Sequence, residues 1–332
     1  MNNKILGCLL GGAAGDALGV PVEFDKLSEI KNKYGSNGIT FETFQGKPLA
    51  SDDTQMTLFT ANGLLMNGDI LKNVWASYQD WLETQVRQTK SDMSHEPVTW
   101  LVDYPEMFAS REPGRTCLQM LIHNTPGSLE HPYNQSKGCG GVMRVAPVGL
   151  LYKKFNDEQT LKYGAQIAAL THGHPMSSLA SAFMAELICK IMIEDKSLKD
   201  CIKLTGYEFS KSFSIYPEAT EFLDIVGQAV KLAELDMSDL EAINTLGQGW
   251  VAEETLAIAI YCSLKHETDF VKAVETAVNH DGDSDSTGAL TGQILGAKYG
   301  TKILPKDFTA KIDLNHVIQI MAKKINEKNN TY

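Results

Sequence analysis

The first apolar stretch of the chain reads Gly7-Cys8-Leu9-Leu10-Gly11-Gly12-Ala13-Ala14-Gly15-Asp16-Ala17-Leu18-Gly19. Glycine recurs there at every fourth position, and a second stretch repeats the spacing at Gly288, Gly292, Gly296 and Gly300. Glycine inside a helix costs roughly 1 kcal/mol relative to alanine, so a regular stripe indicates a compensating gain. Residues four apart form the ridge by which helices most often interlock, and glycine there allows two backbones to approach closely. The stripes predict two tightly packed helices, either against each other, which would bring Asp16 near residues 283–287, or each against a different bulky partner.

Helical periodicity dominates the rest of the chain. Apolar residues recur at i, i+3 and i+4 in the segments 54–66, 70–88, 160–170, 176–194, 218–235, 251–264 and 268–279. Strict alternation is confined to one short run, 39–44, and no βαβ repeat is found. The expected loops are 84–97, 109–115, 124–141 and 205–217. The sequence predicts an all-α fold, a compact multi-helix bundle forming a single domain over 1–325. A polar, frayed tail is expected from residue 323, with 326–332 outside the domain.

The composition excludes some classes of function. The chain has 332 residues, of which 43% are hydrophobic, and a net charge of −11. This charge argues against a membrane surface or nucleic acid as a partner. The six cysteines are scattered, as expected for reduced thiols in a cytoplasmic protein. The apolar start resembles a signal peptide only superficially, because Asp16 follows it closely, and no stretch approaches the roughly 20 apolar residues of a transmembrane helix.

Two acidic clusters lie at opposite ends of the chain, each just before a predicted helix. They read Ser51-Asp52-Asp53-Thr54 and Asp283-Ser284-Asp285-Ser286-Thr287. Carboxylates flanked by hydroxyls are hard oxygen ligands, which Mg²⁺, Mn²⁺ or Ca²⁺ prefers and which suit zinc poorly. An ordinary helix N-cap would explain one acid in each cluster but not several neighbours, which repel one another unless a cation or protons intervene. If the fold brings the clusters together, they form a metal site and the protein is an enzyme.

A glycine-rich turn leads into a further helix at Gly138-Cys139-Gly140-Gly141-Val142-Met143-Arg144. Backbone amides freed by glycine at a helix start can hold a phosphate, and Arg144 could add a positive charge. The alternative is a tight structural turn with Arg144 in an ion pair. His172 and His174 lie in a short turn between helices. Hydrogen bonding suits them better than zinc, because no third nitrogen or sulfur ligand is evident nearby.

These motifs, in this order, resemble the ADP-ribosylglycohydrolase family, which includes the dinitrogen-reductase-activating glycohydrolase. The matching stretches are Gly15 to Gly19 with Glu23, Ser51 to Thr54, Gly138 to Pro147, Thr171-His172 and Gly282 to Ser286. The resemblance implies an all-α orthogonal bundle with two Mg²⁺ or Mn²⁺ ions in a cleft. It implies the metal ligands Ser51, Asp52, Asp53, Asp283, Asp285 and Ser286, with Asp285 bridging the ions.

The resemblance also implies an activity. Family members hydrolyse the C1″ glycosidic bond between ADP-ribose and an acceptor such as arginine or serine. The expected substrate is an ADP-ribosylated protein or small molecule, and the product is ADP-ribose. The general base would be Asp53 or Glu23. The diphosphate and its ribose would lie against Gly138, Gly140, Gly141, Val142, Met143 and Arg144, with His172 close by.

Several residues depart from the family pattern. Cys139 stands where many relatives have asparagine, Lys137 where some have an aromatic residue, and Ser51 and Ser286 where threonine is common. The four metal-binding carboxylates are intact, which favours a hydrolase. Three other readings stay open: a non-catalytic ADP-ribose-binding regulatory or immunity protein, a structural protein like a related lens crystallin, and a hydrolase of another N-riboside.

Overall fold

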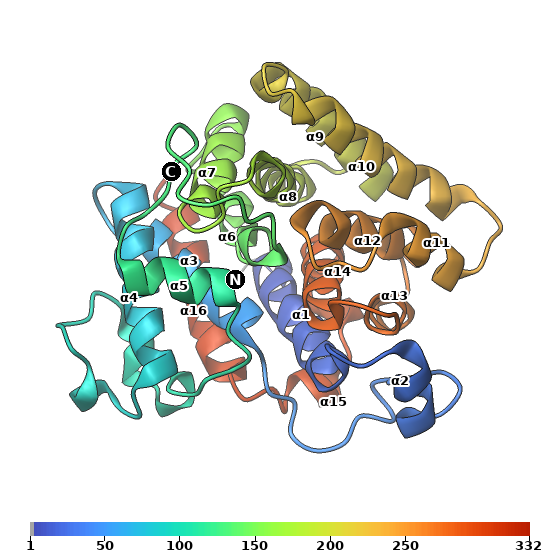
Figure 1. The fold of residues 1–332 in the computed structure, drawn as a ribbon, viewed down its shortest axis with the longest axis horizontal. Coiled ribbons are helices and arrows are strands. Elements are labelled where there is room, and N and C mark those ends of the chain that lie inside the picture. Colours follow the sequence, from blue (N-terminus) through green and yellow to red (C-terminus); the bar gives the residue numbers. More distant parts are fainter. Residues whose placement is uncertain (1–2) are drawn as a thin grey trace.

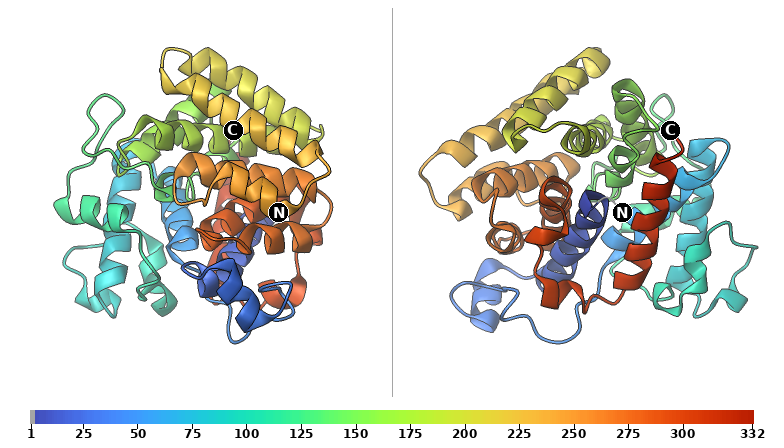
Figure 2. Two further views of the ribbon diagram at one scale, coloured as in Figure 1. Left: turned by 45° about the vertical axis from the view of Figure 1, so that its right-hand side comes forward. Right: turned by 180° about the vertical axis from the view of Figure 1, so that it is seen from behind.

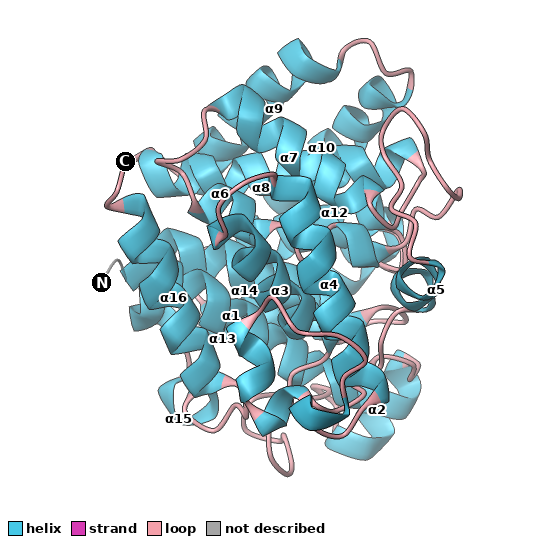
Figure 3. Ribbon diagram, turned by 90° about the vertical axis from the view of Figure 1, so that its left-hand side faces the viewer, coloured by secondary structure: helices cyan, strands magenta, loops and turns pink. Residues whose placement is uncertain are grey.

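The computed structural model describes residues 3–332, and within this range the chain is helical, with no β-strand (Figure 3). The α-helices are α1 (Asn3–Gly19), α2 (Leu27–Tyr34), α3 (Asp52–Leu65), α4 (Ile70–Val86), α5 (Arg115–His123), α6 (Ala146–Leu150), α7 (Asp157–Ala169), α8 (Pro175–Ile193), α9 (Leu198–Phe213), α10 (Glu218–Glu234), α11 (Asp239–Leu246), α12 (Ala252–Lys265), α13 (Phe270–Val278), α14 (Ser284–Tyr299), α15 (Lys306–Thr309) and α16 (Asn315–Asn329). Short 3₁₀ turns include Val20–Val22 and Cys139–Gly141. The prediction of an all-α fold is confirmed.

The two glycine-striped helices, α1 and α14, pack against each other at the centre of the molecule (Figures 1 and 2). A Cβ atom added at Gly11 would clash with the carbonyl oxygen of Gly292, and one added at Gly7 with that of Gly296. At the end of α1, a Cβ on Gly19 would lie 2.5 Å from the Cα of Asp285. The stripes therefore meet each other, and this close approach brings the end of α1 to the start of α14.

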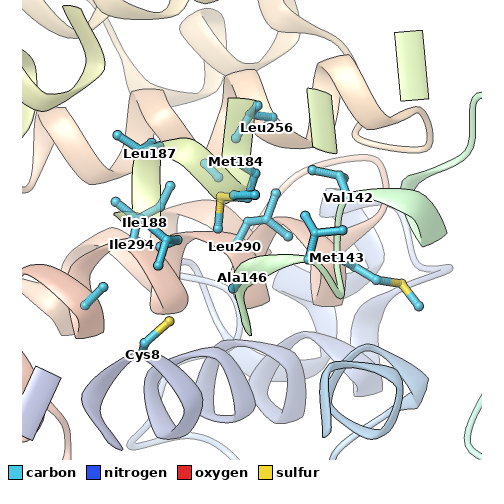
Figure 4. Close-up of a cluster of buried hydrophobic side chains, with 14 of the residues drawn as sticks. Cys8, Val142, Met143, Ala146, Met184, Leu187, Ile188, Leu256, Leu290 and Ile294 are labelled. Carbon is cyan, nitrogen blue, oxygen red and sulfur yellow. The ribbon is translucent and has the colours of Figure 1, made fainter. Parts of the chain in front are cut away.

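The core lies around this central pair. Helix α8 is almost entirely buried, and its Met184 and Ile188 pack near Leu290 of α14 (Figure 4). Val142, directly after the 3₁₀ turn, and Ala146 of α6 belong to the same cluster. Helices α9 and α10 form a pair along one edge (Figure 1). The buried positions of α8 extend around the whole helix, as is usual for a helix in the core of a large domain.

Two segments expected to be irregular are helical. The loop prediction for 205–217 is wrong over its first part, since α9 continues to Phe213. Phe209 and Phe213 are buried one turn apart, and the rings of Phe209 and Phe222 lie 5.2 Å apart across α9 and α10. This apolar contact outweighs the weaker helix propensity of the glycine and serine residues in the segment. The loop prediction for 84–97 also begins too early, because α4 ends at Val86.

The expectation of a frayed tail from residue 323 is also wrong, because α16 continues to Asn329. The Asn329 side chain is buried, and its amide donates to the carbonyl oxygen of Leu150 at 2.8 Å. This buried hydrogen bond holds the last turn of the helix in place, and a solvent-exposed tail would not form such a bond.

Two helical stretches are long and apolar enough for a membrane span by length and composition, contrary to the sequence expectation. They are Asn3–Val22 and Pro175–Ile193. Within the protein, 83% and 94% of their apolar windows are buried. Buried core helices pass the same test, so the two stretches are weak evidence for a membrane.

Candidate metal centre and cleft

The central helix pair brings the two acidic clusters into contact. Ser51 precedes α3 and its Oγ accepts from the Asp53 amide at 3.1 Å, while Asp283 precedes α14 and its Oδ1 accepts from the Ser286 amide at 3.2 Å. Both residues are therefore helix N-caps. The Ser286 hydroxyl donates to Asp53 Oδ1 at 3.3 Å, joining the clusters directly. Capping accounts for one residue in each cluster and leaves the other acids unexplained.

Asp16, near the end of α1, holds the first cluster in place. Its carboxylate accepts from the Ser51 amide at 2.9 and 3.0 Å, and from the amide and hydroxyl of Thr54. Burial raises the pKa of Asp16 to about 7, and the nearby charge of Asp285 adds to the shift. The Asp16 side chain is thus a support for the turn, and the glycine-lined approach of α1 to α14 places it beneath the cluster.

The cleft acids carry oxygen atoms without hydrogen-bond partners among the described residues. Asp53 Oδ2 and Glu23 Oε2 are both buried and unpaired. Glu23, Asp283 and Asp285 each offer a carboxylate oxygen, and these three atoms lie within 4.8 Å of one another. An unpaired buried carboxylate is costly, so these atoms are suited to a ligand that supplies positive charge.

The protonation of these acids follows from their surroundings. Burial raises the pKa of Asp52, Asp53 and Asp283 well above the usual range, and the charge of Asp285 raises each further. Burial and the neighbouring acids raise the pKa of Glu23 to about 10. Without a cation the site must therefore hold protons. Oxygen donors at this density fit a hard divalent cation such as Mg²⁺ or Mn²⁺.

The acids form the floor of a cavity of about 360 Å³. Larger hollows exist on the surface, but they do not contain the acidic turns. The cavity is lined by Glu23, Phe24, Asp52, Asp53, Glu112, Pro113, Gly114, Arg115, Thr116, Cys117, Gly138, Cys139, Gly140, Met143, His172, Trp250, Asp283, Asp285 and Ser286. Of the expected metal ligands only Ser51, whose hydroxyl caps α3, is absent from the lining.

The glycine-rich turn forms one wall of the cleft, but only in part. Gly138, Gly140 and Met143 line the cavity. Gly141 faces α8, where an added Cβ would clash with the Ser177 hydroxyl, and Val142 belongs to the hydrophobic cluster of Figure 4. One side of this short segment therefore faces the cleft, and the other side packs in the core.

Arg144 points away from the cleft, contrary to the expectation that it would contact a phosphate. Its guanidinium is fully buried, donates to the Thr171 hydroxyl at 2.6 Å and the Ile167 carbonyl at 3.2 Å, and lies 4.5 Å from the centre of the Tyr78 ring. None of these partners is a carboxylate, so the alternative of an ion pair is not found either. The backbone enters the core directly after the 3₁₀ turn, and the Arg144 side chain is therefore buried there.

The two histidines have separate roles. His172 lines the cavity, and its Nδ1 lies 2.8 Å from the Thr171 hydroxyl. Burial, with the charge of Arg144, lowers the pKa of His172 to about 3, so its imidazole is neutral. His174 instead caps α8, its Nδ1 accepting from the Met176 amide at 3.1 Å. They do not form a shared metal site.

Sequence reasoning missed three residues that line the cleft, Phe24, Arg115 and Trp250. The rings of Phe24 and Trp250 stack there with centroids 5.8 Å apart and an interplanar angle of 16°. Arg115 begins α5, where the preceding Gly114 amide donates to Asp52 Oδ2 at 3.0 Å. Phe24 directly follows Glu23, which is a signal that could have drawn attention to it. Trp250 and Arg115 reach the site only through the fold.

Comparison with known proteins places the chain among relatives of one kind. The profile of the ADP-ribosylglycohydrolase family matches residues 1–331. The ADP-ribosyl-[dinitrogen reductase] glycohydrolase of Rhodospirillum rubrum is 24% identical over 95% of this chain and 92% of its own length. The ADP-ribosylarginine hydrolase Tri1 of Serratia proteamaculans is 22% identical over 97% of this chain and 79% of its own.

A solved structure supports the same assignment at the level of fold. An ADP-ribosylglycohydrolase-related protein complex superposes with a TM-score of 0.66 over 98% of both chains, at 22% identity. The match shows a shared all-α architecture. With the family profile spanning nearly every residue, the chain belongs to the ADP-ribosylglycohydrolase family of hydrolases.

Proposed function

We propose that this protein hydrolyses the C1″ glycosidic bond joining ADP-ribose to a protein side chain or small molecule, and so reverses ADP-ribosylation. The observation that supports this most is the meeting of two acidic turns on one cleft, where Asp53 Oδ2 and Glu23 Oε2 are buried without partners. The named relatives act on ADP-ribosylated dinitrogen reductase and on ADP-ribosylarginine. The intact carboxylates favour catalysis over binding alone.

The proposed cofactors are two Mg²⁺ or Mn²⁺ ions. Their ligands would come from Ser51, Asp52, Asp53, Asp283, Asp285 and Ser286, all of which are buried and carry oxygen donors. When bound, the ions would supply positive charge that polarises substrate oxygens and offsets the repulsion among the acids. Cys139, beside Asp283, adds a thiol to the edge of this oxygen-rich site.

The carboxylates of the chain suit cleavage of an N- or O-glycosidic bond. The bond breaks through an oxocarbenium-like state, in which positive charge develops at the ribose C1″ atom and is stabilised by nearby carboxylates. A carboxylate must also accept a proton from the attacking water. Asp53 and Glu23 are the two candidates for this general base, because each keeps one unpaired oxygen at the cleft.

The rest of the cleft suits the diphosphate and its ribose. Gly138 and Gly140 expose backbone at one wall, with the His172 imidazole behind them. Arg115 also lines the cavity, at the first residue of α5, a helix start without a side-chain cap. A cationic side chain beside free helix amides attracts phosphate. We therefore assign to Arg115 the phosphate contact that the sequence suggested for Arg144.

The test is release of free ADP-ribose from arginine-, serine- and threonine-linked substrates in Mg²⁺, Mn²⁺ or EDTA. Metal-dependent release from one linkage supports the proposal and identifies the acceptor. Metal-dependent ADP-ribose binding without release from any linkage would favour a non-catalytic binding protein. Release that persists in EDTA would contradict the metal assignment.

Asp53→Asn and Glu23→Gln separate the two candidate bases. If Glu23 is the base, Glu23→Gln should lower turnover while Mn²⁺ binding is retained, because Asp283 and Asp285 still provide ligands. Unchanged turnover in Glu23→Gln would exclude Glu23 and leave Asp53 as the base; lost turnover in Asp53→Asn supports this only where that variant still binds Mn²⁺.

A further inference from the structure

A buried row of polar groups runs from Arg144 to the cleft wall through Thr171 and His172. The Arg144 Nη2 atom lies 2.6 Å from Thr171 Oγ1, which lies 2.8 Å from His172 Nδ1. All three residues have at most 2% of their surface exposed. The far nitrogen of the imidazole, Nε2, forms no hydrogen bond within the described part of the chain, and the histidine lines the cavity.

The direction of the hydrogen bonds in this row follows from the groups it contains. A guanidinium can only donate, so Thr171 Oγ1 is the acceptor of the bond from Arg144. The single hydroxyl proton of Thr171 is then free to be donated onward. His172 Nδ1 is one acceptor for it, and the Cys117 thiol is the other polar group nearby. Sulfur accepts hydrogen bonds weakly, and Arg144 Nη1 already lies 3.4 Å from Cys117 Sγ, so the proton goes to Nδ1.

We propose that Arg144 and Thr171 are positioning residues that keep His172 in the tautomer with its proton on Nε2, so that the cleft wall offers a hydrogen-bond donor to a substrate phosphate or ribose oxygen. This rests on the proposed function in one respect, the identity of the ligand. It assigns to the buried Arg144 an indirect role in recognition, exerted through two other side chains.

The surroundings of His172 support this arrangement. The imidazole packs against the glycine turn, where a Cβ on Gly140 would lie 2.9 Å from His172 Cε1, so the turn leaves the ring edge open to the cleft. An Nε2–H group complements the oxygen atoms of a phosphate. The other neutral tautomer would present a lone pair to those oxygens and repel them. The hydrogen bond that Thr171 donates requires Nδ1 to be unprotonated, and the proton of the neutral ring is therefore on Nε2.

The direct test is the ¹⁵N–¹H correlation spectrum of the imidazole nitrogens in the metal-free, ligand-free protein. His172→Asn identifies the His172 signals among the eight histidines. We expect the wild type and Thr171→Ser to show one neutral Nε2–H tautomer. Thr171→Val, which removes the hydroxyl and keeps the shape, should lose this single state. A proton on Nδ1 in the wild type, or an unchanged spectrum in Thr171→Val, would overturn the proposal.

The consequence for recognition is measured by ADP-ribose binding in the presence of Mg²⁺. Thr171→Val should weaken binding roughly tenfold or more, the scale of one hydrogen bond to a charged group, while Thr171→Ser stays near wild type. Thr205→Val, which removes another buried threonine hydroxyl bonded within its own helix, is the matched control. Thr171→Ala replaces Thr171→Val if the latter does not fold.

The two proposals fail separately. If Thr171→Val binds ADP-ribose as tightly as the wild type, the role in recognition is overturned even where the tautomer changes. If the wild type does not bind ADP-ribose, the proposed function and the recognition role both fail. The tautomer measurement, made without ligand, is independent of either result.

Discussion

Two groups of closely spaced acids in this protein have similar geometry and different electrostatic surroundings. The cleft acids are Glu23, Asp283 and Asp285; the α7–α8 acids are Asp157 and Glu186, with Cys189 beside them. In each group the possible ligand atoms lie within 4.8 Å of one another. Only the second group contains a cation of its own, Lys190, whose Nζ lies 2.7 Å from Asp157 and 3.2 Å from Glu186.

This difference separates a structural cluster from a ligand site. At α7–α8, Lys190 lies at ion-pair distance from both carboxylates and offsets part of their charge, although burial still raises the pKa of Glu186 to about 8. The oxygens of Glu186 also lack a hydrogen-bond partner among the described residues, as do Asp53 Oδ2 and Glu23 Oε2 in the cleft. Glu186 has the ion pair with Lys190, and the cleft oxygens have no ion pair within the described part of the chain. The close spacing of acids is therefore common to both groups, and the absence of a built-in cation is what favours a bound metal ion at the cleft acids.

The largest expected effect is the loss of a cleft acid. Asp285→Ala should lower turnover by roughly 10³-fold or more. The substitution removes one of the carboxylates that would hold the metal ions, and the positive charge that the ions would supply is then lost. Steady-state release of ADP-ribose measures this, with circular dichroism to verify folding. Asp281→Asn, at an exposed position in the same loop, is the control and should keep near-normal activity. Full activity in Asp285→Ala would mean that the cleft acids, like the α7–α8 acids, are not needed for catalysis.

Removing the cation from the α7–α8 acids should affect stability and leave catalysis unchanged. Lys190→Met leaves Glu186 buried without its partner, which we expect to cost about 2–3 kcal/mol of the free energy of unfolding. Urea unfolding measures the loss, and turnover per folded molecule should stay at the wild-type level. Lys199→Met, which breaks the exposed ion pair with Glu234, should leave the unfolding midpoint almost unchanged. A stable Lys190→Met protein would mean that the lysine does not compensate the cluster.

The stabilisation of the protein by Mg²⁺ should depend on pH through the acids of the cleft and not through the α7–α8 acids. In the metal-free protein the pKa of Asp16 is raised to about 7 and that of Glu23 to about 10. Their contributions to stability are complete below the unfolded pKa values near 4 and are lost as the pH rises through the raised ones. Metal binding releases the protons, so the stabilisation by Mg²⁺ should grow with pH.

The measurement is the melting temperature with and without Mg²⁺ at pH 6 and pH 8. Each 1 kcal/mol of extra stabilisation raises the midpoint by roughly 2–4 °C, and the Mg²⁺-induced shift should be larger at pH 8. Lys190→Met should show the same difference in shift, because the α7–α8 acids do not bind the metal. An equal or larger shift at pH 6 would contradict the account.

The smallest expected effect lies at the rim of the cleft. Arg115→Ala should raise KM roughly tenfold or less with little change in kcat, because one exposed charge–phosphate contact is lost and the acids remain. Arg87→Ala, which removes an exposed arginine paired with Glu83 in α4, is the matched control. A large fall in kcat with unchanged KM would place Arg115 nearer the reacting atoms.

Much of the fold could be predicted from local patterns. The glycine stripes that include Gly11 and Gly292 are short local patterns, and each one predicts close helix packing. Only the structure shows that the two stripes pack against each other. The acidic clusters were recognisable because several carboxylates in a row exceed what a helix cap needs. The helical end of α9 was missed because its stability comes from Phe209 and Phe213 packing in the core, and local sequence does not contain that contact.

The walls of the site were harder to predict. Whether a side chain after a tight turn faces the cleft or the core depends on the direction in which the chain leaves the turn. The Arg144 side chain lies in the core, and the predicted contact between Arg144 and a phosphate was wrong for that reason. The Phe24–Trp250 stack joins residues that lie far apart in the sequence, so neither residue signals its partner.

The most direct test of the central claim is a calorimetric titration of the metal-free protein with Mn²⁺. The account predicts two Mn²⁺ ions per chain, with binding weakened or lost in both Asp53→Asn and Asp285→Asn, which alter the two turns separately, and retained in Asp157→Asn. Wild-type Mn²⁺ binding in Asp53→Asn and Asp285→Asn, or its loss in Asp157→Asn, would contradict the claim that the two turns form one metal centre.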